Sequence, residues 1–255
     1  MKFGKVLVLG ATGGIGLAIG QAIFPESEEL ILIGRNTKKC QSLRLRYDRQ
    51  SDVRVLQMNL LEWEQLRHYL QEEVPDLVIN CTGIGKLTRA DEVGESFREE
   101  LWNLNYQMPI QVTREMLTLQ RKWQKPLKVV HLCSLASLYA HPYLADYSAS
   151  KAALLSYHLA LAEEVRQENP DFQIACYVLG AVQTDFFPQT TQHKLGGKSL
   201  QMKAQAVASE VLKSILQGKS YVVIGRRYQV LSSLLGILPQ RFRLQMMAKY
   251  LKKGL

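Results

Sequence analysis

A tyrosine and a lysine four residues apart, Tyr147 and Lys151, are the pair in this chain best suited to acid–base chemistry. The stretch 147–165 is rich in Ala, Leu, Ser and Glu, which favours a helix, and residues four apart lie on one helical face. A free phenol has a pKa near ~10, but an adjacent ammonium favours the phenolate and lowers that pKa. The spacing therefore predicts a tyrosine acid tuned by a lysine. An ordinary solvated pair is the alternative.

A serine should stand beside this pair. The run Leu127–Cys133 is mostly apolar and predicts a buried strand that ends at Ser134. In an open parallel sheet, ligands bind outside the carboxyl ends of the strands. We therefore expect the hydroxyl of Ser134 to hold a substrate carbonyl next to Tyr147.

A glycine-rich loop near the N-terminus predicts a site for a dinucleotide. It follows an apolar strand, 5–9, and precedes a helix from Leu17, which is the context that a phosphate-binding loop requires. A tight turn between strand and helix is the alternative, and the spacing fits both GxxxGxG and GxxGxxG. The loop residues expected to contact the cofactor are Gly10, Thr12, Gly13, Gly14, Ile15 and Gly16.

The end of the second strand carries information on the type of cofactor. Folds that prefer NAD usually place a carboxylate there for the ribose 2′-hydroxyl, whereas an arginine accommodates a 2′-phosphate. This chain has no acid at that point and has Arg35, which favours NADP(H) over NAD(H). After the third strand, Asn59 and Leu60 are expected near the adenine, although Asn59 is also a common turn former.

Strand and helix patterns alternate along the whole chain, which predicts an α/β fold with a doubly wound parallel sheet, a Rossmann-like single domain. Strands are expected at 5–9, 30–33, 53–58, 77–79, 127–133, 173–179 and 221–224, and helices at 17–23, 38–49, 63–73, 97–123, 147–165 and 201–217. Asn105 is unfavourable inside its helix and is either a buried polar joint of the site or exposed. The aperiodic stretch 186–200 fits a mobile lid.

Composition limits the remaining function classes. At 255 residues the chain can form one domain with a full core, and its net charge of +9 implies an anionic partner. The chain has no nucleic-acid motif, no signal peptide pattern and no run of the ~20 apolar residues that span a bilayer. We therefore expect a cytoplasmic protein with reduced thiols and no metal site, because its cysteines are far apart: Cys40, Cys81, Cys133 and Cys176.

The C-terminal segment differs from the rest. Residues 226–255 read as a basic extension of two amphipathic helices on either side of Pro239, after a catalytic domain at 1–225. Such helices can lie in a membrane interface, cover a substrate pocket or pack on a second subunit. The pattern favours the pocket and subunit readings slightly over peripheral membrane contact.

Together these motifs resemble the short-chain dehydrogenase/reductase family along essentially the whole chain. The resemblance selects the glycine pattern Gly10, Gly14, Gly16 and matches Asn80 and Gly83 to the family's NxxG motif. Its catalytic tetrad falls on Asn105, Ser134, Tyr147 and Lys151. Three positions depart from the family pattern: Leu9, Asn59 and Leu179 replace a threonine, an aspartate and a proline.

The resemblance implies hydride transfer between the nicotinamide and a ketone or secondary alcohol, with Tyr147 protonating the oxygen. It implies that Lys151 also binds the ribose, that Asn105 holds a water, and that Gly180, Val182 and Thr184 meet the nicotinamide. The expectation is an NADPH-dependent carbonyl reductase, with a loosely suggested lipid-like substrate, that forms a homodimer or homotetramer and binds no nucleic acid. A non-catalytic NADP(H) sensor or scaffold and an isomerase are the alternatives.

Overall fold

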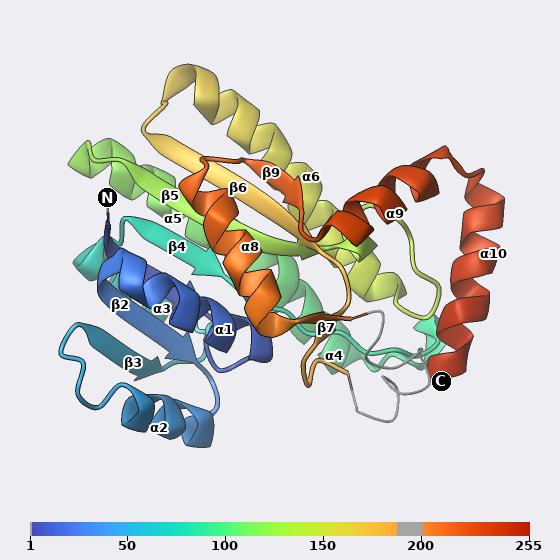
Figure 1. Cartoon of the computed structure of the whole chain (residues 1–255), viewed down its shortest axis with the longest axis horizontal. Helices are drawn as coiled ribbons and strands as arrows, with labels where there is room; N and C mark the ends of the chain where they lie inside the picture. The colour runs from blue at the N-terminus through green and yellow to red at the C-terminus, as the bar shows by residue number, and fades with distance from the viewer. Residues whose placement is uncertain (1, 188–200) are drawn as a thin grey trace.

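A single open sheet of parallel strands organises the computed structural model, which describes residues 2–187 and 201–255 (Figure 1). The strand order is β3-β2-β1-β4-β5-β6-β9, so the chain reverses direction across the sheet between β1 and β4. The strands are β1 (Phe3–Leu9), β2 (Ser27–Gly34), β3 (Val53–Gln57), β4 (Leu77–Asn80), β5 (Leu127–Ser134), β6 (Phe172–Leu179) and β9 (Tyr221–Val223). A short separate pair joins β7 (Val182–Gln183) to β8 (Met202–Lys203).

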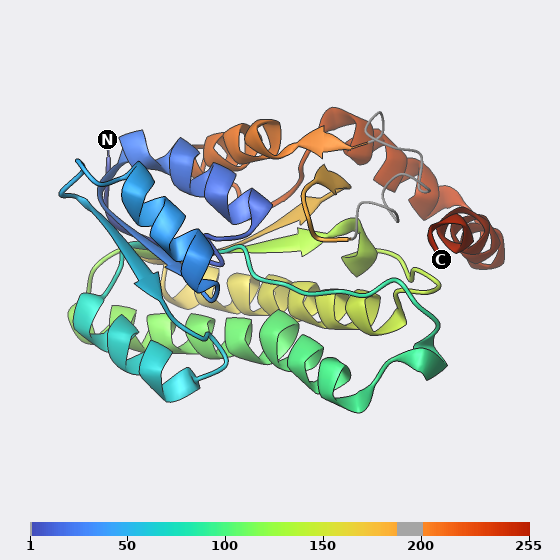
Figure 2. The same ribbon diagram turned by 90° about the horizontal axis from the view of Figure 1, so that it is seen from below.

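Helices cover both faces of this sheet (Figure 2), which confirms the predicted doubly wound fold. One face carries α1 (Gly14–Ile23), α2 (Thr37–Arg46) and α8 (Ala204–Leu216). The other carries α3 (Trp63–Glu73), α4 (Glu95–Trp102), α5 (Met108–Trp123) and α6 (Ala145–Glu168). Short 3₁₀ turns are η1 (Phe24–Glu26), η2 (Ala90–Glu92), η4 (Leu135–Ser137) and η6 (Lys252–Gly254).

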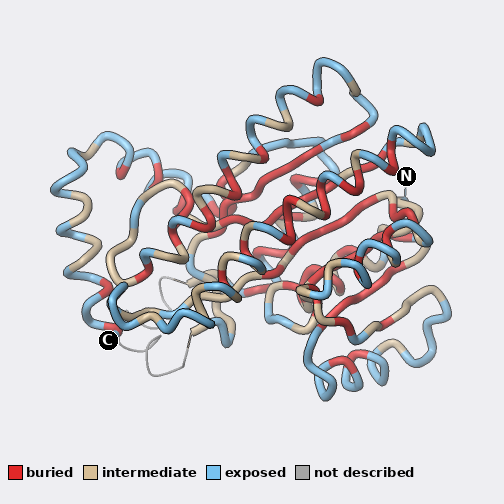
Figure 3. Tube along the Cα trace, turned by 180° about the vertical axis from the view of Figure 1, so that it is seen from behind, coloured by how far each residue is buried: buried red, intermediate tan, exposed pale blue. Residues whose placement is uncertain are grey.

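The central strands are apolar on both faces because each face packs under helices. In β1, Val6 and Val8 join the core beneath α1 and α8, whereas Leu7 and Leu9 join the core on the opposite face, and all four side chains are fully buried. Continuous burial runs along the central strands in Figure 3. A parallel strand that is covered on both faces has apolar residues at successive positions. Strands of this kind could therefore be predicted from the sequence.

The helix expected over 97–123 is interrupted. Between α4 and α5 the backbone forms a turn of π-helix, η3 (Asn103–Gln107), and Asn105 within it is fully buried. A π turn inserts one extra residue into a helix and often marks a functional site. The unfavourable asparagine is thus a buried polar joint, which was one of its two expected readings.

The two helices expected on either side of Pro239 are present as α9 (Arg226–Ile237) and α10 (Gln240–Leu251). The ring of Tyr228 in α9 lies on Gly180, where any side chain would overlap it. None of the helices within the described ranges is long and apolar enough to cross a membrane. The division into a 1–225 domain and a 226–255 extension stays a prediction.

A cluster of ion pairs near the amino ends of β1 and β3 should stabilise the fold. Glu73 accepts hydrogen bonds from both terminal nitrogens of Arg54 at 2.7 Å and from Lys5 Nζ, and the Arg54 hydrogen bonds lower the pKa of Glu73 to about 2. Glu73→Gln should lower the free energy of unfolding at neutral pH by about 2 kcal/mol. Because the folded-state pKa lies below the unfolded value, this difference should be full above pH 4.5 and fade as pH falls towards 2.

Urea denaturation at several pH values measures this difference. Glu72→Gln is the matched control, because the neighbouring Glu72 side chain is 61% exposed and its carboxylate pairs with His68 outside the ion cluster. A Glu73→Gln effect that persisted undiminished at acid pH would rule out the ion cluster as its cause.

Candidate active site

A cavity of about 730 Å³ lies at the carboxyl ends of the strands, between the sheet and the two C-terminal helices. This volume is in the range of pockets for drug-sized ligands. It gathers eight of the residues predicted from the sequence: Ile15, Gly83, Ser134, Tyr147, Lys151, Gly180, Val182 and Thr184. The pocket therefore joins the end of the glycine loop to the predicted acid–base residues.

Tyr147 and Ser134 both line this pocket, and the Ser134 hydroxyl acts to lower the pKa of the Tyr147 phenol. Ser134 ends β5, and its hydroxyl also accepts the backbone N–H of Ala136 at 3.2 Å. Burial has the larger effect and raises the pKa of Tyr147 to about 12. At neutral pH the phenol thus carries the proton that an acid needs.

The expected effect of Lys151 on Tyr147 was wrong for this structure. The sequence predicted that the ammonium would lower the phenol's pKa, but the net direction is upward because the surrounding protein desolvates the phenolate. Lys151 is itself buried, and its Nζ donates to the carbonyl oxygens of Thr82 at 3.2 Å and Leu132 at 3.4 Å. Burial lowers the pKa of this lysine.

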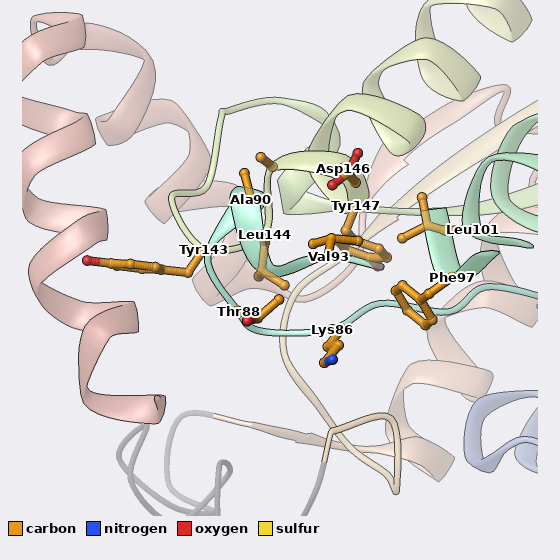
Figure 4. Close-up of a pocket in the computed structure, with 11 residues that line it drawn as sticks. Lys86, Thr88, Ala90, Val93, Phe97, Leu101, Tyr143, Leu144, Asp146 and Tyr147 are labelled. Atoms are coloured by element: carbon orange, nitrogen blue, oxygen red, sulfur yellow. The ribbon is translucent and has the colours of Figure 1, made fainter. Parts of the chain in front are cut away.

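The side chains around a small hollow on another side of Tyr147 fix the position of its ring (Figure 4). Phe97, Leu101 and Val93 line it, and its volume of about 10 Å³ has room for one water at most. Phe186 also packs on the phenol, with ring centroids 5.6 Å apart. The phenol is therefore held between side chains from α4, α6 and the segment after β7.

Asn105 holds the loop that follows β4. Its Oδ1 accepts the backbone N–H of Ile84 at 2.9 Å, and its Nδ2 donates to the carbonyl of Ile84 at 2.9 Å and to Ser150 Oγ at 3.1 Å. A side chain at Gly83 would come within 3.1 Å of Lys151 Nζ and 3.4 Å of Asn105 Oδ1. A glycine at this position therefore lets the loop approach both residues.

Asn80 is directed into the protein. Its Oδ1 accepts from the backbone N–H and the hydroxyl of Thr82, and its Nδ2 lies 3.2 Å from His131 Nδ1. The chain of hydrogen bonds continues from His131 through Thr113 to His158, and burial lowers the pKa of both histidines. The expected cofactor contact of Asn80 is thus at most indirect, through Thr82, whose carbonyl holds Lys151.

The glycine loop has the geometry of a phosphate cradle. Gly10 has a positive φ of 80°, and a side chain at Gly16 would overlap the carbonyl oxygen of Gly10. Helix α1 begins at Gly14 with Gly13 at its N-cap, so no side chain covers its first N–H groups. A side chain at Gly14 would stand 2.7 Å from Thr184. The loop therefore fits a pyrophosphate.

The predicted adenosine residues are placed in three different ways. Arg35 is exposed and its Nη1 donates to Glu100 Oε1 of α4 at 2.5 Å. Asn59 forms a turn, since its Oδ1 accepts the backbone N–H of Leu61 and its Nδ2 donates to Glu62. Leu60 packs in the core, and Thr12 lies against Gly34 at the end of β2. Of these four residues, Arg35 is the one with a charged side chain, and that side chain is exposed.

Sequence reasoning offered the C-terminal helices as a cover for the pocket but identified none of their individual lining residues. The C-terminal helices contribute Arg227, Tyr228, Leu231, Leu235, Met246, Met247, Tyr250 and Leu251, and the chain after β5 contributes Tyr139 and His141. Their apolar spacing gave a sequence signal that fitted a pocket wall, a second subunit or a membrane surface, with the first two readings slightly favoured. Most of the predicted lid, residues 188–200, lies outside the described residues.

Comparisons with known proteins agree with this geometry. A family model described as short chain dehydrogenase matches residues 4–195. A very-long-chain 3-oxoacyl-CoA reductase of Kluyveromyces lactis is 26% identical over 191 residues, which cover 68% of this chain but only 55% of that protein.

Solved structures share the fold at low identity. A short chain dehydrogenase from Burkholderia cenocepacia in complex with NADP has a TM-score of 0.79 at 18% identity and covers 96% of this chain and 98% of that one. A short chain dehydrogenase/reductase from Burkholderia phymatum in complex with NAD has a TM-score of 0.79 at 17% identity, with coverages of 92% and 94%.

The fold and the pocket together define a dinucleotide-dependent oxidoreductase on a doubly wound sheet. Since the family model spans well over half of the sequence, the chain belongs to the short chain dehydrogenase family. It is an enzyme that acts between CH–OH and carbonyl groups with a nicotinamide cofactor. The two solved structures hold different dinucleotides, so they leave the choice between NAD and NADP open.

Proposed function

We propose that this protein reduces the carbonyl group of an apolar ketone with NADPH. The observation that carries the proposal is that Ser134, Tyr147 and Lys151 line one pocket that also reaches Ile15 of the glycine loop. Asn105 and Lys151 complete the predicted tetrad around Gly83. A complete tetrad weighs against the alternative of a non-catalytic sensor or scaffold.

The chemistry follows from the protonation of these groups. When bound, the reduced nicotinamide supplies a hydride to the carbonyl carbon. Tyr147, whose raised pKa keeps its proton at neutral pH, donates that proton to the carbonyl oxygen. Ser134 donates a hydrogen bond to the same oxygen as negative charge develops on it.

Lys151 is proposed to position the cofactor. An ammonium has three N–H donors, and two of them are directed to the carbonyls of Thr82 and Leu132. The third can serve a ribose hydroxyl at the pocket wall. Gly180, Val182 and Thr184, on the same wall, are proposed to meet the nicotinamide.

The preference for NADPH rests on Arg35. An exposed pair such as Arg35–Glu100 contributes only about 0–1 kcal/mol, so a doubly charged 2′-phosphate can displace Glu100 from the guanidinium. Arg35→Ala should lower the ratio of kcat/KM for NADPH over NADH by about tenfold or more, since hydrogen bonds between charged groups are worth about 1.5–3 kcal/mol. Glu100→Gln should raise the same ratio, because it frees the guanidinium.

Initial rates with both cofactors measure these ratios. Arg46→Ala, which removes an exposed cation at the other end of α2, is the control and should leave the ratio unchanged. A wild-type enzyme that prefers NADH, or an Arg35→Ala ratio equal to that of the wild type, would contradict the role of Arg35.

The class of substrate follows from the pocket wall, where Leu135, Leu231, Leu235, Met247 and Leu251 surround the space beside Tyr147. The similarity to a very-long-chain 3-oxoacyl-CoA reductase supports an extended apolar chain. In a series of straight-chain methyl ketones, kcat/KM should rise about fourfold per added CH₂ until the pocket is full, since each buried CH₂ contributes about 0.8 kcal/mol. Loss of NADPH absorbance measures the rates, and a preference for short polar carbonyls would exclude this substrate class.

Two further expectations remain proposals. We infer a homodimer or homotetramer, which sedimentation velocity of the purified chain would test. We also infer a cytoplasmic location, in keeping with four cysteines that are all free thiols.

A further inference from the structure

The outer face of α9 carries an apolar row that the protein core does not cover. Val230, Leu234 and Ile237 are 61%, 57% and 81% exposed. At 100° per residue these side chains fall within an arc of about 60°. The buried row of the same helix, Tyr228 and Leu235 among its members, lies on the opposite side. One apolar side of α9 packs on the protein and the other is exposed. We therefore expect another surface to cover the exposed side.

Helix α10 also carries exposed apolar and basic residues. Phe242 is 55% exposed, Lys249 falls within about 20° of it around the helix and is exposed, and Arg241 is exposed as well. Arg243 is turned inward instead, where its Nη1 donates to the carbonyl of Leu235 at 2.9 Å and its guanidinium lies 4.5 Å from the ring centroid of Tyr139. Arg243 thereby links α10 to α9, and the two helices follow one another at the C-terminal end of the molecule (Figures 1 and 3).

The charge of this segment determines what can cover it. Residues 226–255 contain seven of the 32 Lys and Arg residues and none of the 23 Asp and Glu residues, so most of the net charge of +9 lies there. A symmetric contact between two copies would bring two such cationic faces together, which costs free energy. An anionic surface with an apolar interior satisfies both the cations and the apolar row.

We propose that the outer face of α9 and α10 binds the surface of an anionic lipid bilayer. Val230, Leu234, Ile237 and Phe242 enter the boundary between headgroups and acyl chains, while the flanking arginines and lysines meet the lipid phosphates. Other sides of the same helices line the pocket through Leu231, Leu235, Met247 and Leu251. Docking therefore places the pocket wall at the lipid surface, where an apolar substrate is concentrated.

Co-sedimentation with vesicles tests this proposal and needs no turnover, so its outcome is independent of the proposed reaction. The intact protein should sediment with phosphatidylcholine vesicles that contain phosphatidylglycerol, much less with phosphatidylcholine alone, and less at high salt. The triple variant Val230→Ser/Leu234→Ser/Ile237→Ser should lose about tenfold or more of its binding. Arg241→Gln/Lys249→Gln should weaken binding and reduce its salt dependence.

Matched controls separate this face from exposed apolar surface in general. Leu45→Ser/Leu216→Ser removes two leucines that are 77% and 52% exposed elsewhere, and it should bind vesicles like the wild type. The triple variant should keep full activity on a short ketone, because none of its three residues lines the pocket. Equal vesicle binding by wild type and triple variant would overturn the proposal. A second result would also overturn it: a wild-type protein that is dimeric and does not bind vesicles, together with a triple variant that is monomeric. That result would assign the face to a second copy of the chain.

Discussion

Replacing Tyr147 by phenylalanine should abolish carbonyl reduction and leave NADPH binding intact. The ring keeps its contacts with Phe186 and with the side chains around the small hollow, so the packing of the pocket is preserved. The hydroxyl is lost, and with it the acid that protonates the substrate oxygen. General acid catalysis contributes about 10²–10⁴-fold, so kcat should fall by at least that range.

Steady-state rates and the quenching or enhancement of NADPH fluorescence measure the two quantities separately. Tyr157→Phe is the control, because Tyr157 stands ten residues further along the same helix and is partly buried beside His158. It should retain wild-type kcat. Turnover by Tyr147→Phe within a few-fold of the wild type would mean that another group donates the proton.

Replacing Ser134 by alanine should reduce kcat by about 10²–10³-fold, the usual effect of removing one donor to a developing oxyanion. The same change removes the hydroxyl that acts to lower the pKa of Tyr147, so the phenolate formed in the reaction also loses stabilisation. KM should change little if Ser134 acts mainly in the transition state. Initial rates over a range of ketone concentrations separate the two constants.

Threonine at the same position provides the conservative comparison. Ser134→Thr keeps a hydroxyl at the end of β5 and should recover a large part of the lost kcat. Ser156→Ala, at an exposed position of α6, should have no effect. If Ser134→Ala and Ser134→Thr were equally impaired, the effect would come from packing at the strand end and the proposed hydrogen bond would be excluded.

The order of strands and helices could be predicted from the sequence because burial on both faces leaves a simple pattern. Strands such as β1 and β5 are unbroken apolar runs, and the helices between them carry apolar residues on one side. Their ends were placed within a few residues. The predicted convergence of Ser134, Tyr147 and Lys151 at one pocket also follows from topology. Ser134 ends β5, and the first turns of α6, which carry Tyr147 and Lys151, lie at the same edge of the sheet.

Contacts between distant parts of the chain could not be predicted from local patterns. The pairing of Arg35 with Glu100 joins residues 65 apart, and the hydrogen bond between Asn80 and His131 joins residues 51 apart. Spacing along one element carries no information on either. The π turn around Asn105 was likewise invisible, because periodicity shows where a helix is but not that it contains one extra residue.

The pKa of Tyr147 was mispredicted for a related reason. Two residues four apart on a helix suggested that the charge of Lys151 would dominate. Burial has the larger effect, and it depends on Phe186 and on the pocket walls around the phenol, which come from remote segments. The outcome still suits an acid, since a phenol with a raised pKa retains its proton until the substrate oxygen accepts it.

Transfer of deuterium tests the central claim most directly. The enzyme is supplied with NADPH that carries deuterium at both C4 positions of the dihydronicotinamide ring, together with a long-chain methyl ketone, and the product is analysed by mass spectrometry. We expect a secondary alcohol with one deuterium on the carbinol carbon, formed by the wild type and not by Tyr147→Phe. An enzyme that binds NADPH but yields no deuterated alcohol from any ketone of the series would contradict the account.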